Sequence, residues 1–359
     1  MQLYILGKTY EVIGMVDTYE SVLWIPKYND VGECEIYVPC DNDYFALLKK
    51  GHYIYRYDDE MFCKIESVEI QTDMEKGDYL ICTGLDIAQT LSGRVIQSQS
   101  VFSGKVVEFI ERLLLDNVVN APLASRLIPN FRIDTKNFDE FTETIEASAF
   151  GEDLLQRIMT TCKSYNLGFR VSYDISDGFL VFRLYRGKNK ALADSVEYVE
   201  FSPQFANIIS SNYKEDNRNY KNVACVRYKD ADEQIKVMWV YVGEEPRFEN
   251  RREISVDATG QSRDVEVDGE KITLTDDEYA QLIWNIGVDA LAGTRPIQEY
   301  TGTVDTVETY EYKVDYNLGD IVKVINEYGI EAEAQVIEVM ESDDNDNGHV
   351  IEPKFEYLN

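Results

Sequence analysis

Catalytic side chains are scarce in this sequence of 359 residues. His52 and His349 are the only histidines, and neither belongs to an H-E-x-x-H or H-x-x-x-H arrangement that would bind zinc. A Ser-His-Asp triad would need one of these imidazoles, and the G-x-S-x-G turn that presents a nucleophilic serine is missing. Neither a P-loop nor a G-x-G-x-x-G phosphate loop occurs. The sequence therefore predicts a protein that is not an enzyme and needs no cofactor.

One motif has the spacing of metal ligands. Asp343, Asn345 and Asn347 alternate ahead of Gly348, as at the start of an EF-hand loop. The twelfth position is Lys354 instead of Glu, and strands are expected on both sides. Because Asn-Gly is a favoured hairpin turn, the sequence favours a turn, and a calcium site is the weaker alternative.

Carboxylates are abundant throughout the chain. Asp and Glu number 66 against 35 Lys and Arg, which gives a formal net charge of −31. With so many carboxylates, no pair can be singled out for glycoside hydrolysis. This charge would repel nucleic-acid phosphates and anionic membranes. The excess negative charge would serve solubility or adaptation to a saline environment. Alternatively, it would keep the surface from adhering to DNA that passes close by.

Tyr53, Tyr55 and Tyr57 alternate along one predicted strand and therefore share one of its faces. They could form a sugar-stacking platform, as in an adhesin. The favoured alternative is one face of a barrel wall that another element covers.

The six cysteines show no C-x-x-C spacing, which favours buried reduced thiols over a disulfide framework or a zinc site. The first residues lack a basic region and a cleavage site, so we expect a first strand and not a signal peptide. No apolar run of about 18 residues predicts a membrane span. The cysteines are Cys34, Cys40, Cys63, Cys82, Cys162 and Cys225.

Short strands dominate residues 1–100, and their spacing predicts a small barrel or sandwich. A short helical turn at Tyr44–Lys49 interrupts them. The candidate strands are Gln2–Leu6, Glu11–Val16, Ser21–Ile25, Glu33–Pro39, Tyr53–Tyr57, Phe62–Glu69 and Tyr79–Thr83.

Helical periodicity begins near residue 101. Ser103 is predicted to cap a first helix, and Glu152–Tyr165 to form a second. The hairpin Phe169–Ile175 and Phe179–Tyr185 follows. Helices laid on a hairpin predict an α+β layer at 101–200.

Strands return after residue 201, at Ala224–Tyr228 and Ile235–Val242. Residues 243–274 are charged and rich in turn formers, which predicts a surface excursion. Thr275-Asp-Asp-Glu278 is a capping box that opens a helix ending near Gly293. The last predicted strands lie near 299–312, 320–326, 332–340 and 349–357.

Two hairpins look like copies of one unit. Gly51-His-Tyr-Ile-Tyr-Arg-Tyr is followed by Ile65-Glu-Ser-Val68, and Gly319-Asp-Ile-Val-Lys-Val-Ile by Ile337-Glu-Val-Met340. Any two hairpins share such features, so duplication and coincidence both stay open. A duplicated module would let one chain present two similar faces to a ring of higher symmetry.

These patterns predict an α+β, mainly β fold with two similar small β-barrels. The first barrel is expected at 1–100, an α+β module at 101–200, and the second barrel at 201–359 with a helical insertion at about 243–297.

Short segments along nearly the whole chain resemble siphovirus-type tail proteins from phages of Gram-positive bacteria. They are Tyr4-Ile-Leu-Gly, Ile13-Gly-Met-Val-Asp17, Tyr19-Glu-Ser-Val-Leu-Trp24, Gly32-Glu-Cys-Glu-Ile-Tyr-Val-Pro39, Phe201-Ser-Pro-Gln-Phe-Ala-Asn-Ile, Tyr220-Lys-Asn222, Tyr316-Asn-Leu-Gly-Asp-Ile-Val322 and Ile337-Glu-Val339.

The resemblance implies the tail-hub fold that contractile-phage baseplate hubs and type VI secretion spikes share, assembled as a homotrimer. The expected function is structural: a hub in the virion, at the tail tip or baseplate of a phage, prophage or tailocin. It would cap the tail tube and anchor host-facing proteins. The implied partners are the tail-tube or distal tail protein, the tape-measure protein, and fibre or receptor-binding proteins.

Two rival functions stay open. A receptor- or glycan-binding tail protein would use the tyrosines, and a peptidoglycan hydrolase would use the carboxylates. Larger relatives append a lytic domain after the hub, and because the sequence stops just after its last predicted strand, we expect no such activity. No sequence-specific nucleic-acid partner is expected.

Overall fold

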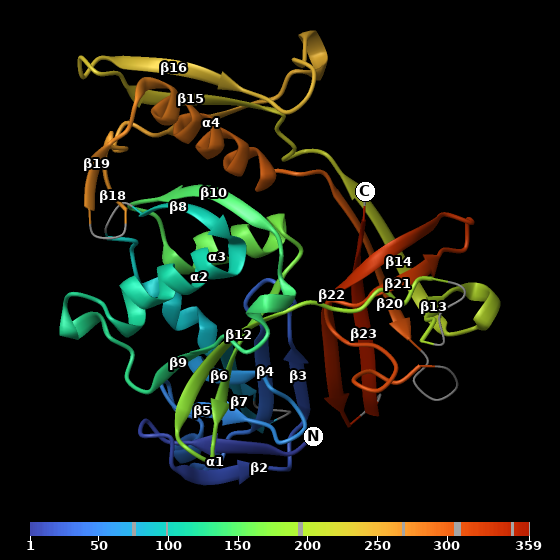
Figure 1. Cartoon of the computed structure of the whole chain (residues 1–359). Helices are drawn as coiled ribbons and strands as arrows, with labels where there is room; N and C mark the ends of the chain where they lie inside the picture. Colours follow the sequence, from blue (N-terminus) through green and yellow to red (C-terminus); the bar gives the residue numbers. More distant parts are fainter. Residues whose placement is uncertain are drawn as a thin grey trace.

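The computed structural model describes residues 1–73, 77–97, 100–192, 197–267, 270–304, 310–345 and 348–358. The fold is mostly β (Figure 1). A layer that contains the helices of residues 106–164 lies between the N-terminal strands and the strands of residues 223–257. Thirteen strands form one large sheet, and three smaller sheets accompany it among the described residues.

The N-terminal β-module holds the first seven strands, in the spatial order β3-β4-β7-β6-β5-β1-β2. Its strands alternate as predicted: in β4, Cys34, Ile36 and Val38 point into the core. The elements are β1 (Leu3–Leu6), β2 (Val12–Val16), β3 (Ser21–Ile25), β4 (Glu33–Pro39), α1 (Asn42–Leu47), β5 (Tyr53–Tyr55), β6 (Phe62–Asp73) and β7 (Gly77–Asp86).

The C-terminal β-module has the spatial order β14-β20-β23-β22, with β21 on β22 and β13 on β21. It joins the N-terminal module where β22 pairs with β3 and Glu341 lies opposite Trp24. The strands are β13 (Glu200–Phe201), β14 (Ile208–Asp216), β20 (Ile297–Val304), β21 (Ile321–Ile325), β22 (Glu331–Asp344) and β23 (Gly348–Tyr357). Pairing among the described residues runs as an open path from β14 to β2, so closure into two barrels stays a prediction.

The two modules repeat one topology. In chain order, β3 to β7 of the first correspond to β14, β20, β21, β22 and β23 of the second, and each set has the same spatial order. The strands that precede the two sets, β1 and β13, differ in direction. Strand β1 runs antiparallel to β5, whereas β13 runs parallel to β21. A topology shared over five strands favours duplication over coincidence.

Backbone hydrogen bonds match as well. Gly51 N donates to Ile65 O at 2.8 Å and Ile65 N to His52 O at 2.8 Å, while Gly319 N donates to Val336 O at 2.8 Å and Val336 N to Asp320 O at 2.9 Å. Both return strands then shift register, after Ile65 and after Val336. The structural equivalent of Ile65 is therefore Val336, one residue before the match that the sequence suggested.

The α+β layer differs from the prediction at its first helix. Ser103 does not cap this helix; it lies in strand β8 opposite Glu146, and the helix begins after Lys105. Pairing with β10 holds this segment extended, and a local capping pattern cannot reveal such a distant partner. The elements are β8 (Ser100–Lys105), α2 (Val106–Leu114), β9 (Phe131–Asp134), β10 (Thr144–Ala149), α3 (Leu154–Ser164), β11 (Gly168–Asp174) and β12 (Phe179–Tyr185).

Residues 217–296 lie between β14 and β20 and build an inserted layer, far from β1–β7 in Figure 1. It joins the α+β layer where β18 (Asp264–Val267) pairs with β8. Helix α4 packs on the sheet β16-β15-β17 through Tyr279, Leu282 and Ile283. The layer contains β15 (Val223–Lys229), β16 (Ile235–Val240), β17 (Glu253–Asp257), β18 (Asp264–Val267), β19 (Glu270–Thr273) and α4 (Asp276–Ala292).

The surface excursion expected at 243–274 includes the strands β17, β18 and β19, which the sequence analysis did not anticipate. One sequence interpretation is corrected in this layer: strands β15 and β16 pack with α4 and do not pair with the C-terminal module. The capping box is confirmed: the Thr275 hydroxyl accepts a hydrogen bond from Glu278 N, and the Glu278 carboxylate accepts one from Thr275 N.

All six cysteines are free thiols, as the sequence predicted. Burial raises the pKa of the Cys63, Cys82 and Cys162 thiols, and only the thiolate reacts readily. Cys40 and Cys225 are the two that are not fully buried. A colorimetric thiol reagent should therefore count at most two thiols in the native protein and six after unfolding without reductant. A lower count after unfolding would reveal a disulfide.

Candidate functional site: an ionic cleft between the β-modules

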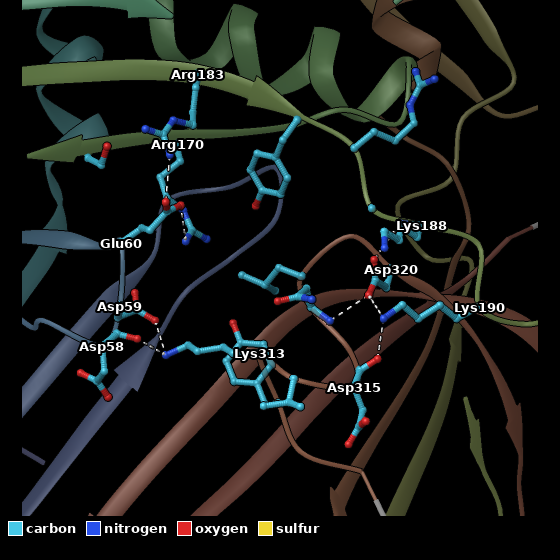
Figure 2. Close-up of a pocket in the computed structure, with 18 of the residues that line it drawn as sticks. Asp58, Asp59, Glu60, Arg170, Arg183, Lys188, Lys190, Lys313, Asp315 and Asp320 are labelled. Atoms are coloured by element: carbon cyan, nitrogen blue, oxygen red, sulfur yellow. Dashed lines mark hydrogen bonds and ion pairs between the residues drawn. The ribbon is translucent and has the colours of Figure 1, made fainter. Parts of the chain in front are cut away.

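A cleft of about 1100 Å³ lies where the two β-modules meet the hairpin β11–β12. Its walls come from the turn after β5, from the hairpin, from the chain that follows β12, and from the segment ahead of β21 (Figure 2). Segments more than 250 residues apart in the sequence thus build one site.

A buried ionic joint lies beside the cleft, and its residues Asp59 and Lys313 line the cleft wall. Arg56 reaches from the N-terminal module to Glu341, with 3.0 Å between Nη2 and Oε2, and only 2% and 5% of these side chains are exposed. Lys313 reaches back from the C-terminal module to Asp59 at 2.7 Å and also contacts Glu341 at 3.1 Å. The Arg56 guanidinium lies over the ring of Trp24. Each module therefore supplies a cation to the other.

Neighbouring cations keep this joint ionised. Burial acts to raise the pKa of Asp59, but Lys313 and Arg170 outweigh it, and the pKa is lowered. Asp86 shows the opposite balance: burial raises its pKa to about 7, although its carboxylate accepts a hydrogen bond from Ala88 N. Asp86 therefore titrates near neutrality.

Asp86 should make the protein less stable as the pH rises. Its folded pKa lies above the unfolded value, so its contribution is complete below about pH 4 and is lost as the pH rises through 7. Relative to wild type, Asp86→Asn should gain about 2–3 kcal/mol in unfolding free energy between pH 5 and pH 8. Urea unfolding at the two pH values measures this gain, with exposed Asp78→Asn as the control. Equal changes in both variants would contradict it.

A second buried pair anchors the chain that follows β12. Lys190 lies 3.3 Å from Asp320, and both side chains are buried. Asp320 also accepts hydrogen bonds from Lys188 N at 2.7 Å and Asn317 N at 2.9 Å, and Figure 2 shows it between the two lysines. This segment is thereby fixed against the C-terminal module.

The third ionic group is formed by the two arginines of the hairpin. Arg170 and Arg183 lie directly opposite each other on β11 and β12. Glu60, from the turn after β5, lies 2.8 Å from Arg183 and 3.8 Å from Arg170 (Figure 2). The sequence analysis identified none of these ionic groups, because their partners are remote in the chain and charged residues are common everywhere.

The candidate calcium ligands are used differently. The Asp343 carboxylate accepts hydrogen bonds from the Met1 amine and, at 2.6 Å, from the Tyr19 hydroxyl. Asn345 Nδ2 contacts Tyr19 O and Glu20. Asn347 lies outside the described residues.

Absence of a calcium site therefore stays a prediction, which thermal melts can test. Melting curves in calcium and in chelator should coincide, since a ligand that binds only the folded state would raise its stability. A calcium-dependent shift of several degrees that disappears in Asp343→Ala would establish the EF-hand-like alternative. In the described part of the chain, no three His, Cys, Asp or Glu side chains are grouped to hold a metal.

The tyrosine strand is covered, as the favoured alternative predicted. Tyr53 and Tyr55 are partly buried against the core shared by the N-terminal module and the α+β layer, and Tyr53 stacks on Phe62. Tyr57 lies beyond the end of β5 and is 67% exposed. Two of the three rings are thus unsuited to stacking on a sugar.

The histidines have ordinary contacts. His52 Nδ1 lies 2.8 Å from the backbone oxygen of Leu47, and His349 Nε2 lies 3.7 Å from Glu341. Neither contact resembles a nucleophile–base pair. No helix in the described ranges combines the length and apolar composition that crossing a membrane requires.

Comparison with known proteins identifies the fold. Three solved tail proteins, two of them from prophages, align with 99% of the chain: a tail protein from Neisseria meningitidis MC58 (TM-score 0.54, 14% identity, 95% of that chain), the 43 kDa tail protein of prophage MuSo2 from Shewanella oneidensis (0.53, 12%, 98%) and prophage tail protein gp18 from Listeria monocytogenes EGD-e (0.51, 13%, 94%). No curated protein matches.

The family model of the siphovirus ReqiPepy6 Gp37-like protein matches residues 2–355, nearly the whole sequence. This match confirms the resemblance to siphovirus proteins that the short segments indicated. The chain therefore belongs to the siphovirus ReqiPepy6 Gp37-like protein family and has the fold of phage tail proteins.

Proposed function

We propose that the protein is the structural hub of a phage tail tip or baseplate, where it caps the tail tube and anchors host-facing tail proteins. The observation that carries this proposal is the repeated β-module, with its matching strand order and matching glycine hydrogen bonds. Three chains could bind a tube that has six similar contact surfaces if each chain offers two equivalent modules. Closed cyclic symmetry is usual for homo-oligomers. The proposed assembly is a homotrimer.

The proposed parts of the hub follow the sequence boundaries except at the insertion. Residues 1–100 supply one ring-forming module and 201–359, without the inserted residues 217–296, supply the other, while 101–200 supply the α+β layer. The unit inserted between β14 and β20 lies away from the N-terminal module in Figure 1, which suits an attachment point for fibre or receptor-binding proteins. The net charge of −31 suits a conduit past which DNA slides.

The decisive measurement is stoichiometry in an assembled complex. The chain should be co-expressed with the tail-tube, distal tail and tape-measure proteins of its own gene cluster and the complex weighed by native mass spectrometry. Three copies on a hexameric ring are expected. Because each chain has a formal net charge of −31, isolated chains repel one another, and they should associate more readily at high salt, where this repulsion is screened. One or six copies on the ring would overturn the trimer.

A further inference from the structure

We propose that Arg170 and Arg183 form a docking point for an acidic segment of another tail protein, and that Glu60 occupies this point in the free chain. The inference rests on the proposed function only in naming the partner as another tail protein. That the partner segment is acidic is inferred from the contacts of the two arginines.

Arg183 has more hydrogen-bonding capacity than Glu60 alone can use, whereas Arg170 also acts electrostatically on Asp59 and Asp86. Like charges directly opposite each other on paired strands repel, yet Arg170 and Arg183 are held in that position. Each guanidinium has five N–H donors, and both arginines share Glu60. Arg183 Nε is shielded from solvent and has no hydrogen-bond partner in the described part of the chain.

Glu60 has the properties of a replaceable occupant. Its side chain is 57% exposed, whereas only 12% of the Arg170 side chain is exposed. It comes from the turn between β5 and β6 and not from the hairpin. A partner carboxylate could therefore take its place while the arginines stay fixed on their strands.

The other buried acids of the cleft are already bound. Asp59 pairs with Lys313, and Asp320 pairs with Lys190 and two backbone N–H groups. Asp59 also interacts electrostatically with Arg170, whereas the ion pair of Arg183 is with Glu60. An incoming anion would therefore displace Glu60 chiefly from Arg183.

The lining and size of the cleft favour a peptide. Seven tyrosines line it, together with three arginines, three lysines and seven acids. Tyrosine and arginine are the lining residue types that dominate the binding energy of protein interfaces. Its volume of about 1100 Å³ can hold several side chains of an extended segment. A chain of −31 repels long polyanions such as nucleic acid, whereas a short segment with a few carboxylates experiences less repulsion.

Fluorescence anisotropy with a labelled ten-residue peptide that carries three glutamates among serine and glycine tests the proposal on the full chain. Binding should weaken with added salt. Arg183→Gln should reduce affinity at least tenfold, and Arg183→Lys should restore part of the loss, because lysine keeps the charge without the forked geometry. Circular dichroism should confirm that each variant is folded. Inorganic phosphate and a ten-base single-stranded DNA serve as the other probes.

The matched pair Glu60→Gln and Glu197→Gln separates occupancy from net charge. Both acids line the cleft and each change removes one negative charge, but Glu197 pairs with Lys188, whereas Glu60 pairs with Arg170 and Arg183. Glu60→Gln should bind the peptide about tenfold more tightly than Glu197→Gln does. Equal affinities, no peptide binding by either variant, or binding of DNA or phosphate in preference to peptide would each overturn the proposal. Because the assay uses the isolated chain, its outcome does not depend on hub assembly.

Discussion

Arg56→Met is expected to lower the free energy of unfolding by about 3–5 kcal/mol, because it leaves a buried carboxylate without its principal cation. Arg56 and Glu341 are 2% and 5% exposed, and Lys313, which also pairs with Asp59, would remain as the cation in contact with Glu341. The contact between the guanidinium and the Trp24 ring would also be lost. Chemical denaturation followed by tryptophan fluorescence and by circular dichroism measures the change.

A double-mutant cycle shows whether the ionic pair itself is responsible. Arg56→Met combined with Glu341→Met should be less destabilising than the sum of the two single changes, since the buried Glu341 carboxylate is removed together with its cation. Asp58, which also pairs with Arg56, is 68% exposed and loses little when the pair is broken. Arg218→Met is the surface control, because Arg218 pairs with Asp216 at 2.5 Å while 84% of the arginine side chain is exposed. The control should change little. Additive effects in the cycle would mean that Arg56 acts through packing alone.

Gly187→Ala is expected to destabilise the protein by about 3 kcal/mol or more, because its new methyl group has no room. A Cβ at this position would lie 1.9 Å from the carbonyl carbon of Gly319 and 2.2 Å from Asp320 N. Both are backbone atoms next to the buried Lys190–Asp320 pair, so neither can move without disturbing that pair. Urea unfolding of the variant measures the loss.

The duplicated glycines provide a matched comparison for this close packing. Gly51 and Gly319 have φ values of +85° and +88°, so alanine suffers the same backbone strain, roughly 1–2 kcal/mol, at both. A Cβ on Gly51 would meet only Lys8, at 3.6 Å, whereas one on Gly319 would lie 2.3 Å from the Tyr28 ring. Gly319→Ala should therefore cost more than Gly51→Ala. Equal losses would show that Tyr28 moves aside freely.

These predictions concern the same region because it is where the β-modules meet. The Arg56–Glu341 pair joins the two modules, and Gly187 fixes the chain that leads from the α+β layer into the second one. A loosened joint would change the relative position of the two faces that the proposed hub offers to a ring. Variants that fold but fail to assemble in the stoichiometry experiment would reveal this effect.

Local interactions were readable from the sequence. Alternation along β4 and the capping box of α4 each depend on residues within a few positions, and the structure confirms both. Gly51 and Gly319 were recognised as matching turns because glycine adopts positive φ at little cost. The family resemblance followed from such short segments.

Only the tertiary structure decided which remote segments meet. Ser103 joins a strand because β10 pairs with it, and Val336 replaces Ile337 as the repeat equivalent because a register shift follows it. Arg56 and Glu341 are separated by 285 residues, and in a chain with 66 acidic residues no local pattern marks which carboxylate an arginine will find. Side-chain periodicity reports burial and local geometry, whereas the ionic cleft depends on strand pairings that bring distant charges together in a desolvated space.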